Sequence, residues 1–310
     1  MINCWNGRPY YSLSTYLKEQ YGEKIYKLSL SGNMTCPNRD GTLSHTGCIF
    51  CSEGGSGDFS ALKSLRIHEQ IQHQKNLLKN KTTGNKFIGY FQSFTNTYAP
   101  VEYLESLFME AILHPEIIGL SIGTRPDCLS DDILKLLERL NSIKPVWVEL
   151  GLQSIHEKTA LVINRGYTLP IFDKAVADLN ELNIPVIVHT ILGLPYETPE
   201  QIRETILYLN HLNISGIKLQ LLHILKNTPL AILYQDSPFP VYTLEEYLDI
   251  LIMCVEHLSP AIVIHRLTGD GPKRLLVAPS WSSNKKLVLN TMNQEFLKRN
   301  TWQGRLYSCS

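Results

Sequence analysis

The chain has 310 residues, 44% of them hydrophobic, and its 29 Lys and Arg residues balance its 29 Asp and Glu residues. Such a chain can bury a full core as one large or two ordinary domains, which excludes intrinsic disorder, a collagen-like fibre and a coiled coil. No apolar stretch approaches the roughly 18 residues of a membrane-spanning helix, and the first 20 residues lack the basic and apolar regions of a signal peptide. We therefore expect a soluble, cytoplasmic protein.

Short apolar runs rich in β-branched residues recur along the chain and predict buried strands. In chain order they cover residues 25–31, 86–91, 117–122, 146–150, 185–192, 217–222 and 261–267. Segments with helical spacing lie between many of them, at 101–114, 131–141, 170–183, 197–213 and 242–258. The alternation predicts an α/β fold with a parallel sheet and right-handed crossovers, either barrel-like or doubly wound. We expect a core at residues 25–267, a lead-in at 1–24 and a C-terminal extension at 268–310.

Polar and glycine-rich clusters directly follow each predicted strand, for example QSFTNT after the second, GTRPDC after the third and GLQS after the fourth. The carboxyl ends of parallel strands share one rim, so the loops that leave them converge on one mouth. A binding module would not need so many convergent polar loops. The pattern therefore favours a barrel-type enzyme.

Three of the seven cysteines, Cys36, Cys48 and Cys51, lie within 16 residues in the spacing Cys-x11-Cys-x2-Cys. An odd number of scattered cysteines argues against a disulfide framework, and clustered thiols in a reducing compartment are typical of metal sites. Three thiolates hold zinc when a fourth ligand such as His45 joins them, or a [4Fe-4S] cluster with one open iron. The spacing alone leaves both alternatives open. Cys4, Cys254 and Cys309 are too few for a second cluster.

The surroundings of the three cysteines carry a resemblance to a known family. The triplet follows the first strand, Phe50 directly precedes its last cysteine, and glycines follow at Gly54 and Gly55. This resembles the radical S-adenosylmethionine (SAM) superfamily, and the long first gap is similar to the branch that includes the Elongator catalytic subunit. Within that branch, nine strings resemble the YhcC/YtqA family: TCPNRDGT, GCIFCS, FQSFTNTYAP, GTRPDC, ELGLQS, NRGYT, LGLPYET, LLHILKNTPL and HRLTGDGP.

The resemblance implies a partial parallel (β/α)6-type barrel with a C-terminal extension, a [4Fe-4S] cluster and SAM. One electron, from a donor such as flavodoxin or ferredoxin, would cleave SAM and yield a 5'-deoxyadenosyl radical that removes a hydrogen atom from an unactivated carbon. The family is implicated in completing wobble-uridine side chains of tRNA, by turning a carboxymethylaminomethyl group into an aminomethyl group. Two alternatives are radical chemistry on a small metabolite or protein, and a non-catalytic, zinc-stabilised RNA-binding protein.

The same resemblance assigns the cofactor contacts. Cys36, Cys48 and Cys51 would ligate three irons, with Phe50 near the adenine. The segment after the second strand replaces the family's Gly-Gly-Glu-like motif at the methionine amino group, through Gln92, Ser93, Thr95 and Asn96. Gln153 would contact the ribose, Arg165 the methionine carboxylate, and Gly193 and Leu194 the adenine side. The structural alternatives are a polar turn, an ion pair and an ordinary strand-to-helix turn.

Several further side chains are candidates for the reaction itself. Glu149 shares a strand face with Gln153 and is predicted to point inward, with Arg125 as the partner of its charge. His223 and His265 are expected on the last two rims, for proton transfer near the substrate. Cations and polar groups on the same rims would hold a substrate carboxylate or a tRNA phosphate, namely Lys226, Asn227, Arg266 and Asp270. Cys128 is predicted to pack at a helix start, and His189 to be a hydrogen-bonded core residue.

Overall fold

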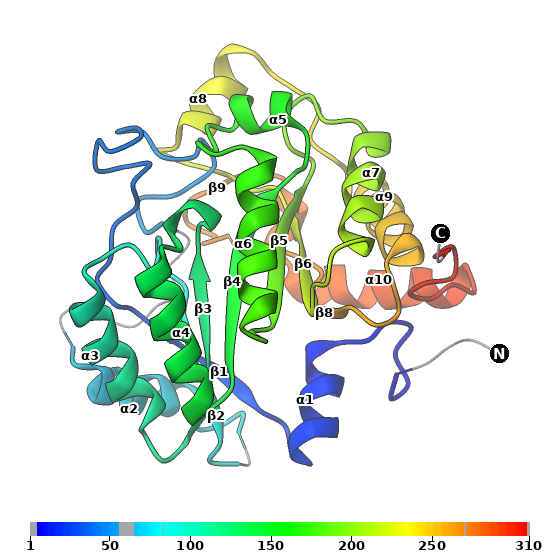
Figure 1. The fold of residues 1–310 in the computed structure, drawn as a ribbon. Helices are drawn as coiled ribbons and strands as arrows, with labels where there is room; N and C mark the ends of the chain where they lie inside the picture. Colours follow the sequence, from blue (N-terminus) through cyan, green and yellow to red (C-terminus); the bar gives the residue numbers. More distant parts are fainter. Residues whose placement is uncertain (1–4, 56–64, 83, 270, 309–310) are drawn as a thin grey trace.

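The computed structural model describes residues 5–55, 65–82, 84–269 and 271–308. Its centre is one sheet of seven parallel strands in the order β1-β2-β3-β4-β5-β6-β8 (Figure 1). These are β1 (Tyr26–Leu30), β2 (Phe87–Phe91), β3 (Ile117–Thr124), β4 (Val146–Gln153), β5 (Val186–Leu192), β6 (Gly216–Leu221) and β8 (Val263–Arg266). Each coincides with a predicted apolar run. The edge strands β1 and β8 do not pair with each other in the described chain, so the sheet is a partial barrel, as predicted.

Helices between the strands cover the outer face of the sheet. They are α2 (Ile67–Leu78), α3 (Val101–Ile112), α4 (Asp131–Ile143), α6 (Leu169–Glu181), α7 (Pro199–Asn210) and α9 (Leu244–His257). In α4 the side chains of Ile133, Leu136, Leu137 and Leu140 are buried, which is the stripe that a 3.6-residue period presents to a sheet. Thr198 caps α7 in a capping box with Gln201, and Pro199 is its first residue. No helix among the described residues is long and apolar enough to cross a membrane.

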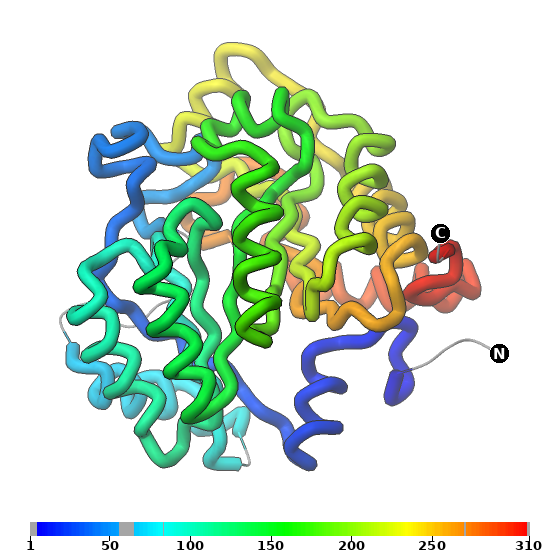
Figure 2. Tube along the Cα trace, viewed as in Figure 1, coloured from blue at the N-terminus to red at the C-terminus, as the bar shows by residue number. Residues whose placement is uncertain are grey.

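The shorter elements lie at the two ends of the barrel and beyond it. Helices α5 (Glu157–Val162) and α8 (Pro229–Asp236) flank the carboxyl ends of the strands, and strands β7 (Ile224–Leu225) and β9 (Leu276–Ala278) form a separate antiparallel pair. In Figure 2 the loop that holds the cysteines runs beside α8, and the backbone N–H of Leu230 donates to the Ile49 carbonyl at 2.9 Å. This contact joins the cysteine loop to the first turn of α8.

The segments before β1 and after β8 pack beside each other. Helix α1 (Leu13–Tyr21) contacts β8, and α10 (Lys285–Lys298) packs on α9. Gln303, in the segment after β8, joins the two segments through its side-chain amide. The amide accepts a hydrogen bond from the Tyr11 backbone N–H at 2.8 Å and donates one to the Ile262 carbonyl at 2.8 Å. The division into a lead-in, a core and an extension stays a prediction.

The barrel interior changes from apolar to charged along its axis. At the amino ends of the strands, Leu17 of α1 packs in an apolar cluster with Ile88, Trp147 and Ile187. Two residues further along β4 the same interior face carries Glu149, because side chains of a strand alternate between its faces. The apolar cluster therefore closes one end of the barrel, and the polar end is open toward the cysteine loop.

Candidate active site

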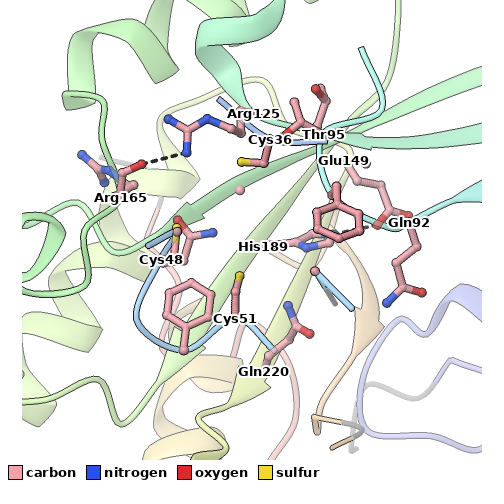
Figure 3. A pocket seen from close by; sticks show the side chains of 18 of the residues that line it. Cys36, Cys48, Cys51, Gln92, Thr95, Arg125, Glu149, Arg165, His189 and Gln220 are labelled. Atoms are coloured by element: carbon pink, nitrogen blue, oxygen red, sulfur yellow. Dashed lines mark hydrogen bonds and ion pairs between the residues drawn. The ribbon is translucent and has the colours of Figure 1, made fainter. Parts of the chain in front are cut away.

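The loops at the carboxyl ends of the strands surround two adjoining cavities. The inner one is lined by Cys36, Cys48 and Cys51 (Figure 3). The outer one reaches Lys273 and Lys285 in the C-terminal segment. Six residues line both cavities: Phe50, Gln92, Gln153, His189, Gln220 and Arg266. The cavities thus form one continuous cleft at the rim where α/β barrels place their active sites.

Backbone turns and one guanidinium shape the cysteine loop. The N–H of Arg39 donates to the Cys36 carbonyl at 2.8 Å, and the N–H of Cys51 donates to the Cys48 carbonyl at 3.0 Å. The Arg39 side chain crosses the loop and donates to the carbonyls of Cys51 at 3.0 Å and Ser52 at 2.6 Å. Figure 3 shows all three sulfur atoms facing the inner cavity. Two separate turns are therefore held together so that their thiols share one space.

The electrostatics of this loop favour a thiolate. A hydrogen bond from the Cys51 thiol lowers the pKa of Cys48 to about 7, against the effect of burial, and the positive charges of Arg125 and Arg39 act in the same direction. The side-chain amide of Asn38 also donates to the Cys48 sulfur at 3.5 Å. The pKa of Cys51 is raised well above its usual value, first because it donates that hydrogen bond and second because it is buried. Thiolates are the form that binds metals, so the loop is prepared for metal ligation.

The donor set fits an iron-sulfur cluster better than a single zinc ion. In the described part of the chain, no three His, Cys, Asp or Glu side chains close around one ion position. His45, the proposed fourth zinc ligand, borders a surface hollow that Cys51 and Arg39 also line, but it does not line the inner cavity with Cys36 and Cys48. A [4Fe-4S] cluster takes each thiolate on a different iron, so three thiols spread around a cavity suit it.

A buried carboxylate, Glu149, organises the floor of the inner cavity. Its side chain is 0% exposed, and five side chains donate to its two oxygens. The donors are Lys27 at 2.7 Å, Ser121 at 2.6 Å, Tyr90 at 2.9 Å, His189 at 2.6 Å, and Lys218. Burial by itself would raise the pKa of Glu149, but the ammonium groups of Lys218 and Lys27 outweigh it and hold that pKa well below its usual value. Glu149 is therefore an anion at neutral pH.

Gln153 is the last residue of β4, and its backbone φ of +66° is one that residues other than glycine rarely adopt. Its amide lines both cavities, and the Tyr167 hydroxyl lies 3.4 Å from its Oε1. A Cβ atom at Gly151 would lie 2.7 Å from its Nε2, so a larger residue at position 151 would displace the amide end of Gln153. Such strain persists only where the surroundings impose it, and it is concentrated at functional sites.

Comparison with known proteins identifies the family to which this cleft belongs. Residues 36–209 match the model of the radical SAM superfamily, and residues 214–298 match that of the radical SAM C-terminal domain. The chain belongs to the radical SAM superfamily. It is therefore an enzyme of the radical SAM type, and the three cysteines, which lie within the matched residues, are consistent with the cluster that membership in this superfamily implies.

Relatives resemble the chain over most of its length. Uncharacterized protein YtqA of Bacillus subtilis is 41% identical over 298 residues, which cover 96% of this chain and 92% of that protein. Protein YhcC of Escherichia coli is 35% identical over 270 residues, covering 87% and 86%. Among solved structures, the archaeal Methanocaldococcus infernus Elp3 superposes with a TM-score of 0.65 at 18% identity, covering 88% of this chain and 63% of that chain. This last likeness shows a shared fold.

The radical SAM residues predicted after β2 divide into two groups. Gln92 and Thr95 line the inner cavity. Asn96 is buried instead, and its side-chain amide donates to the carbonyls of Phe91 at 3.1 Å and Gly123 at 2.7 Å. Ser93 is also buried and lines neither cavity. The structure thus places Asn96 where it supports the loop and Ser93 away from both cavities, and a SAM contact by Gln92 or Thr95 stays a prediction.

Arg165 lines the inner cavity, but its guanidinium is engaged with the backbone. It donates to the carbonyls of Ser154 at 2.7 Å, Tyr167 at 3.0 Å and Leu152 at 3.2 Å, and its carboxylate partner is Glu157 at 3.4 Å. These contacts hold the turn after β4. A contact between Arg165 and the SAM carboxylate stays a prediction, and the structure shows a supporting role for this side chain.

The predicted adenine-side loop lies behind Phe50 rather than at the cavity surface. Leu194 is 3% exposed and belongs to an apolar cluster against which Phe50 packs. Gly193 has φ +88° and lies close to the Tyr242 ring. Neither residue lines the inner or the outer cavity, whereas Phe50 lines both. Leu194 therefore helps to position Phe50, and a contact of Gly193 or Leu194 with the adenine side of SAM stays a prediction.

The predicted partnership between Glu149 and Arg125 is wrong. Arg125 forms a bidentate pair with Asp127, two residues along the chain, at 2.9 Å and 2.7 Å. Its Nη1 also donates to the Arg165 carbonyl at 2.9 Å, as Figure 3 shows. Glu149 does point inward, but its cationic partners are Lys27 and Lys218 from β1 and β6. The signal missed in the sequence is a lysine within each of two apolar strands.

The two predicted histidines have different surroundings. His223 lines the outer cavity, with its Nε2 3.0 Å from the Ser282 hydroxyl. His265 does not reach the rim, because the β6–β8 pairing shifts register and brings Arg266 level with Lys218. His265 packs instead edge-on against Trp147, with ring centroids 6.0 Å apart, and lines neither cavity. The expected rim position of His265 is therefore wrong.

The remaining predictions concern residues near the cleft. His189 is hydrogen-bonded to Glu149, as predicted, but it also lines both cavities, a position that its apolar strand does not indicate. Asn227 borders the surface hollow that contains His45, and Lys226 is exposed. Cys128 ends a short 3-10 turn before α4 and lines neither cavity. Asp270, Cys4 and Cys309 lie outside the described residues.

We expect Gln153→Gly to separate strain from function. Glycine adopts φ +66° freely, so the free energy of unfolding should stay the same or rise by about 1 kcal/mol, while affinity for SAM falls about tenfold because the amide is lost. Thermal unfolding and anaerobic equilibrium dialysis with SAM measure the two effects. Gln153→Asn is the control, because asparagine tolerates this backbone and keeps an amide. A glycine variant that binds SAM as the wild type does would remove Gln153 from the SAM site.

Proposed function

We propose that this radical SAM enzyme acts on tRNA and converts a carboxymethylaminomethyl group on the wobble uridine to an aminomethyl group. The observation that supports an anionic substrate is the charge of the cleft. The chain as a whole has a net charge of zero, yet Glu149 is the single acidic residue among the described residues that line the two cavities. The basic ones are Arg39, Arg125, Arg165, Lys218, Arg266, Lys273 and Lys285. A basic cleft in a neutral protein concentrates polyanions such as RNA.

In this proposal the inner cavity holds the cofactors and the outer cavity admits the nucleotide. A [4Fe-4S] cluster on Cys36, Cys48 and Cys51, reduced by a carrier of the flavodoxin or ferredoxin class, supplies the electron that cleaves SAM. Phe50 offers an aromatic wall that lines both cavities, and Gln92 offers amide groups at their junction. The side chains of the chain itself bind, orient and exclude water, and the family resemblance provides the specific reaction.

The outer cavity is suited to a nucleotide by its exposed cations. Lys273 is exposed at its edge, and Lys285 lies at the start of α10 on the same side. Lysines at such positions neutralise phosphates without reading a base, so they would fix the register of the anticodon arm. His223 and Ser282 line the same outer cavity, and in this proposal they contact a flipped-out base.

Deletion of the gene tests the proposal. We expect tRNA from the deletion strain to accumulate the carboxymethylaminomethyl nucleoside and to lose the aminomethyl nucleoside and its derivatives, as measured by mass spectrometry of digested tRNA. Complementation with the wild-type gene should restore the pattern, and complementation with a Cys48→Ala gene should not. An unchanged wobble-uridine pool would contradict the tRNA substrate. The radical SAM assignment would still stand, and a small metabolite or a protein would become the favoured substrate.

A further inference from the structure

The floor of the inner cavity carries more positive than negative charge. Lys27 and Lys218 both pair with Glu149, and their side chains are 17% and 6% exposed. Burial and the Lys218 charge lower the pKa of His189 to about 4, so its imidazole is neutral and donates to Glu149 without adding charge. When Lys218 is protonated, two ammonium groups therefore share one carboxylate. Buried charges are costly unless they are paired. The cluster of Lys27, Lys218 and Glu149 could therefore be neutralised by one further anion.

Lys218 is the ammonium group that faces the cavity. Its Nζ donates to Glu149 and to the Tyr90 hydroxyl at 2.9 Å, which accounts for two of its three N–H donors. Lys218 lines the inner cavity, whereas Lys27 lines neither cavity. Burial is also the main reason why the pKa of Lys218 falls to about 7, a cost that a bound anion would relieve. One donor and the excess charge are thus presented to a ligand.

The neighbouring residue on the same face of β6 adds a second donor. Gln220 follows Lys218 by two residues, so its side chain points to the same side of the strand, and it lines both cavities. An ammonium group and a side-chain amide together can bind the two oxygens of a carboxylate. Phosphate groups of RNA would bind the exposed lysines of the outer cavity instead. Only the side chain of a substrate nucleotide, and not the RNA backbone, would reach the floor of the inner cavity.

We propose that Lys218, assisted by Gln220, binds the carboxylate of the substrate side chain at the inner end of the cleft. The proposal rests on the proposed function, in which the uridine carries a carboxymethyl group, and it makes Lys218 the residue that determines specificity for that group. A carboxylate is also present in SAM, so the experiment must distinguish the two sources.

The test uses the anaerobically reconstituted full-length enzyme with SAM and two synthetic anticodon stem-loops. One carries the carboxymethylaminomethyl uridine, and the other carries its uncharged carboxamide analogue. We expect the wild type to bind the carboxylate probe at least about tenfold more tightly, the size of one charge-assisted hydrogen bond. Lys218→Met should reduce this ratio below about twofold, and Lys218→Arg should retain a preference. Lys273→Met is the matched control: it should weaken both probes equally and leave the ratio unchanged.

Each other outcome overturns the inference in an identifiable way. Equal binding of both probes by the wild type would overturn the role of Lys218 while the tRNA proposal stands, whereas binding of neither probe would overturn both. An unchanged ratio in Lys218→Met, with a matching loss of SAM affinity, would assign the carboxylate to SAM. If Lys218→Met does not fold, Lys218→Gln, which keeps a hydrogen-bond donor near Glu149 and Tyr90 but removes the charge, replaces it with the same expected ratio.

Discussion

Replacing Glu149 with glutamine should lower the free energy of unfolding by about 3–5 kcal/mol, the cost of removing one partner from a buried ion pair. The variant leaves Lys27 and Lys218 inside the barrel with no carboxylate, although both side chains remain largely buried. The NH₂ group of the glutamine amide is itself a donor. It would face side-chain donors that bond to a carboxylate oxygen in the wild type. Chemical denaturation of the anaerobic apoprotein, monitored by circular dichroism, measures the loss.

Compensation within the same cluster gives this prediction its control. Glu149→Gln combined with Lys27→Met removes one positive charge along with the negative one, so at least half of the lost stability should return. Glu157→Gln alters a glutamate that is 49% exposed and 3.4 Å from Arg165, and it should cost less than about 1 kcal/mol. A Glu149→Gln variant within 1 kcal/mol of the wild type would show that the two lysines lose their charges at little cost.

The free energy of unfolding at low pH should also depend on Glu149. Because the lysines hold the pKa of Glu149 below its usual value of 4.5, the carboxylate stabilises the folded state fully above that pH. Its contribution is lost as the pH falls from about 4.5 through the folded-state pKa. The wild type should therefore lose stability over this window, and the difference between it and Glu149→Gln should shrink there.

The strands and the cysteine loop were predictable because their signals are local. Strands of a parallel sheet are buried on both faces, so they form the continuous apolar runs by which all seven were found. The three metal-binding candidates lie within 16 residues, and the loops around them follow strand ends. Such features depend on neighbours in sequence, and a single sequence displays them directly.

The partners of Glu149 were not predictable from the sequence, because they depend on strand order and register. Lys27 and Lys218 are far apart in the chain and meet only after β1 and β6 take their places in the barrel. Arg125 was the nearer candidate in sequence, but Asp127 satisfies it locally. His265 failed for a similar reason, since a register shift between β6 and β8 determines which side chain of β8 lies level with Lys218.

Loss of any one of Cys36, Cys48 or Cys51 should have the largest effect on activity. Alanine at any of the three removes one thiolate from a set of three, and we expect SAM cleavage by the reconstituted, reduced enzyme to fall at least about a thousandfold. The fold should remain, because these half-buried thiols lie in a loop and form no disulfide among the described residues. Iron and sulfide content, visible absorption and the yield of 5'-deoxyadenosine measure the effect, and circular dichroism measures folding.

The other described cysteines provide the controls. Burial raises the pKa of Cys128 to about 12, so it is a neutral thiol, and Cys254 is buried in α9. Cys128→Ala and Cys254→Ala should keep the wild-type iron content, since neither residue lines the cleft. Retention of four irons by Cys48→Ala would contradict the ligand set. A wild-type protein that binds one zinc and no sulfide under the same conditions would replace the cluster with the zinc alternative, and the cleft would then lack the electron source on which its proposed chemistry depends.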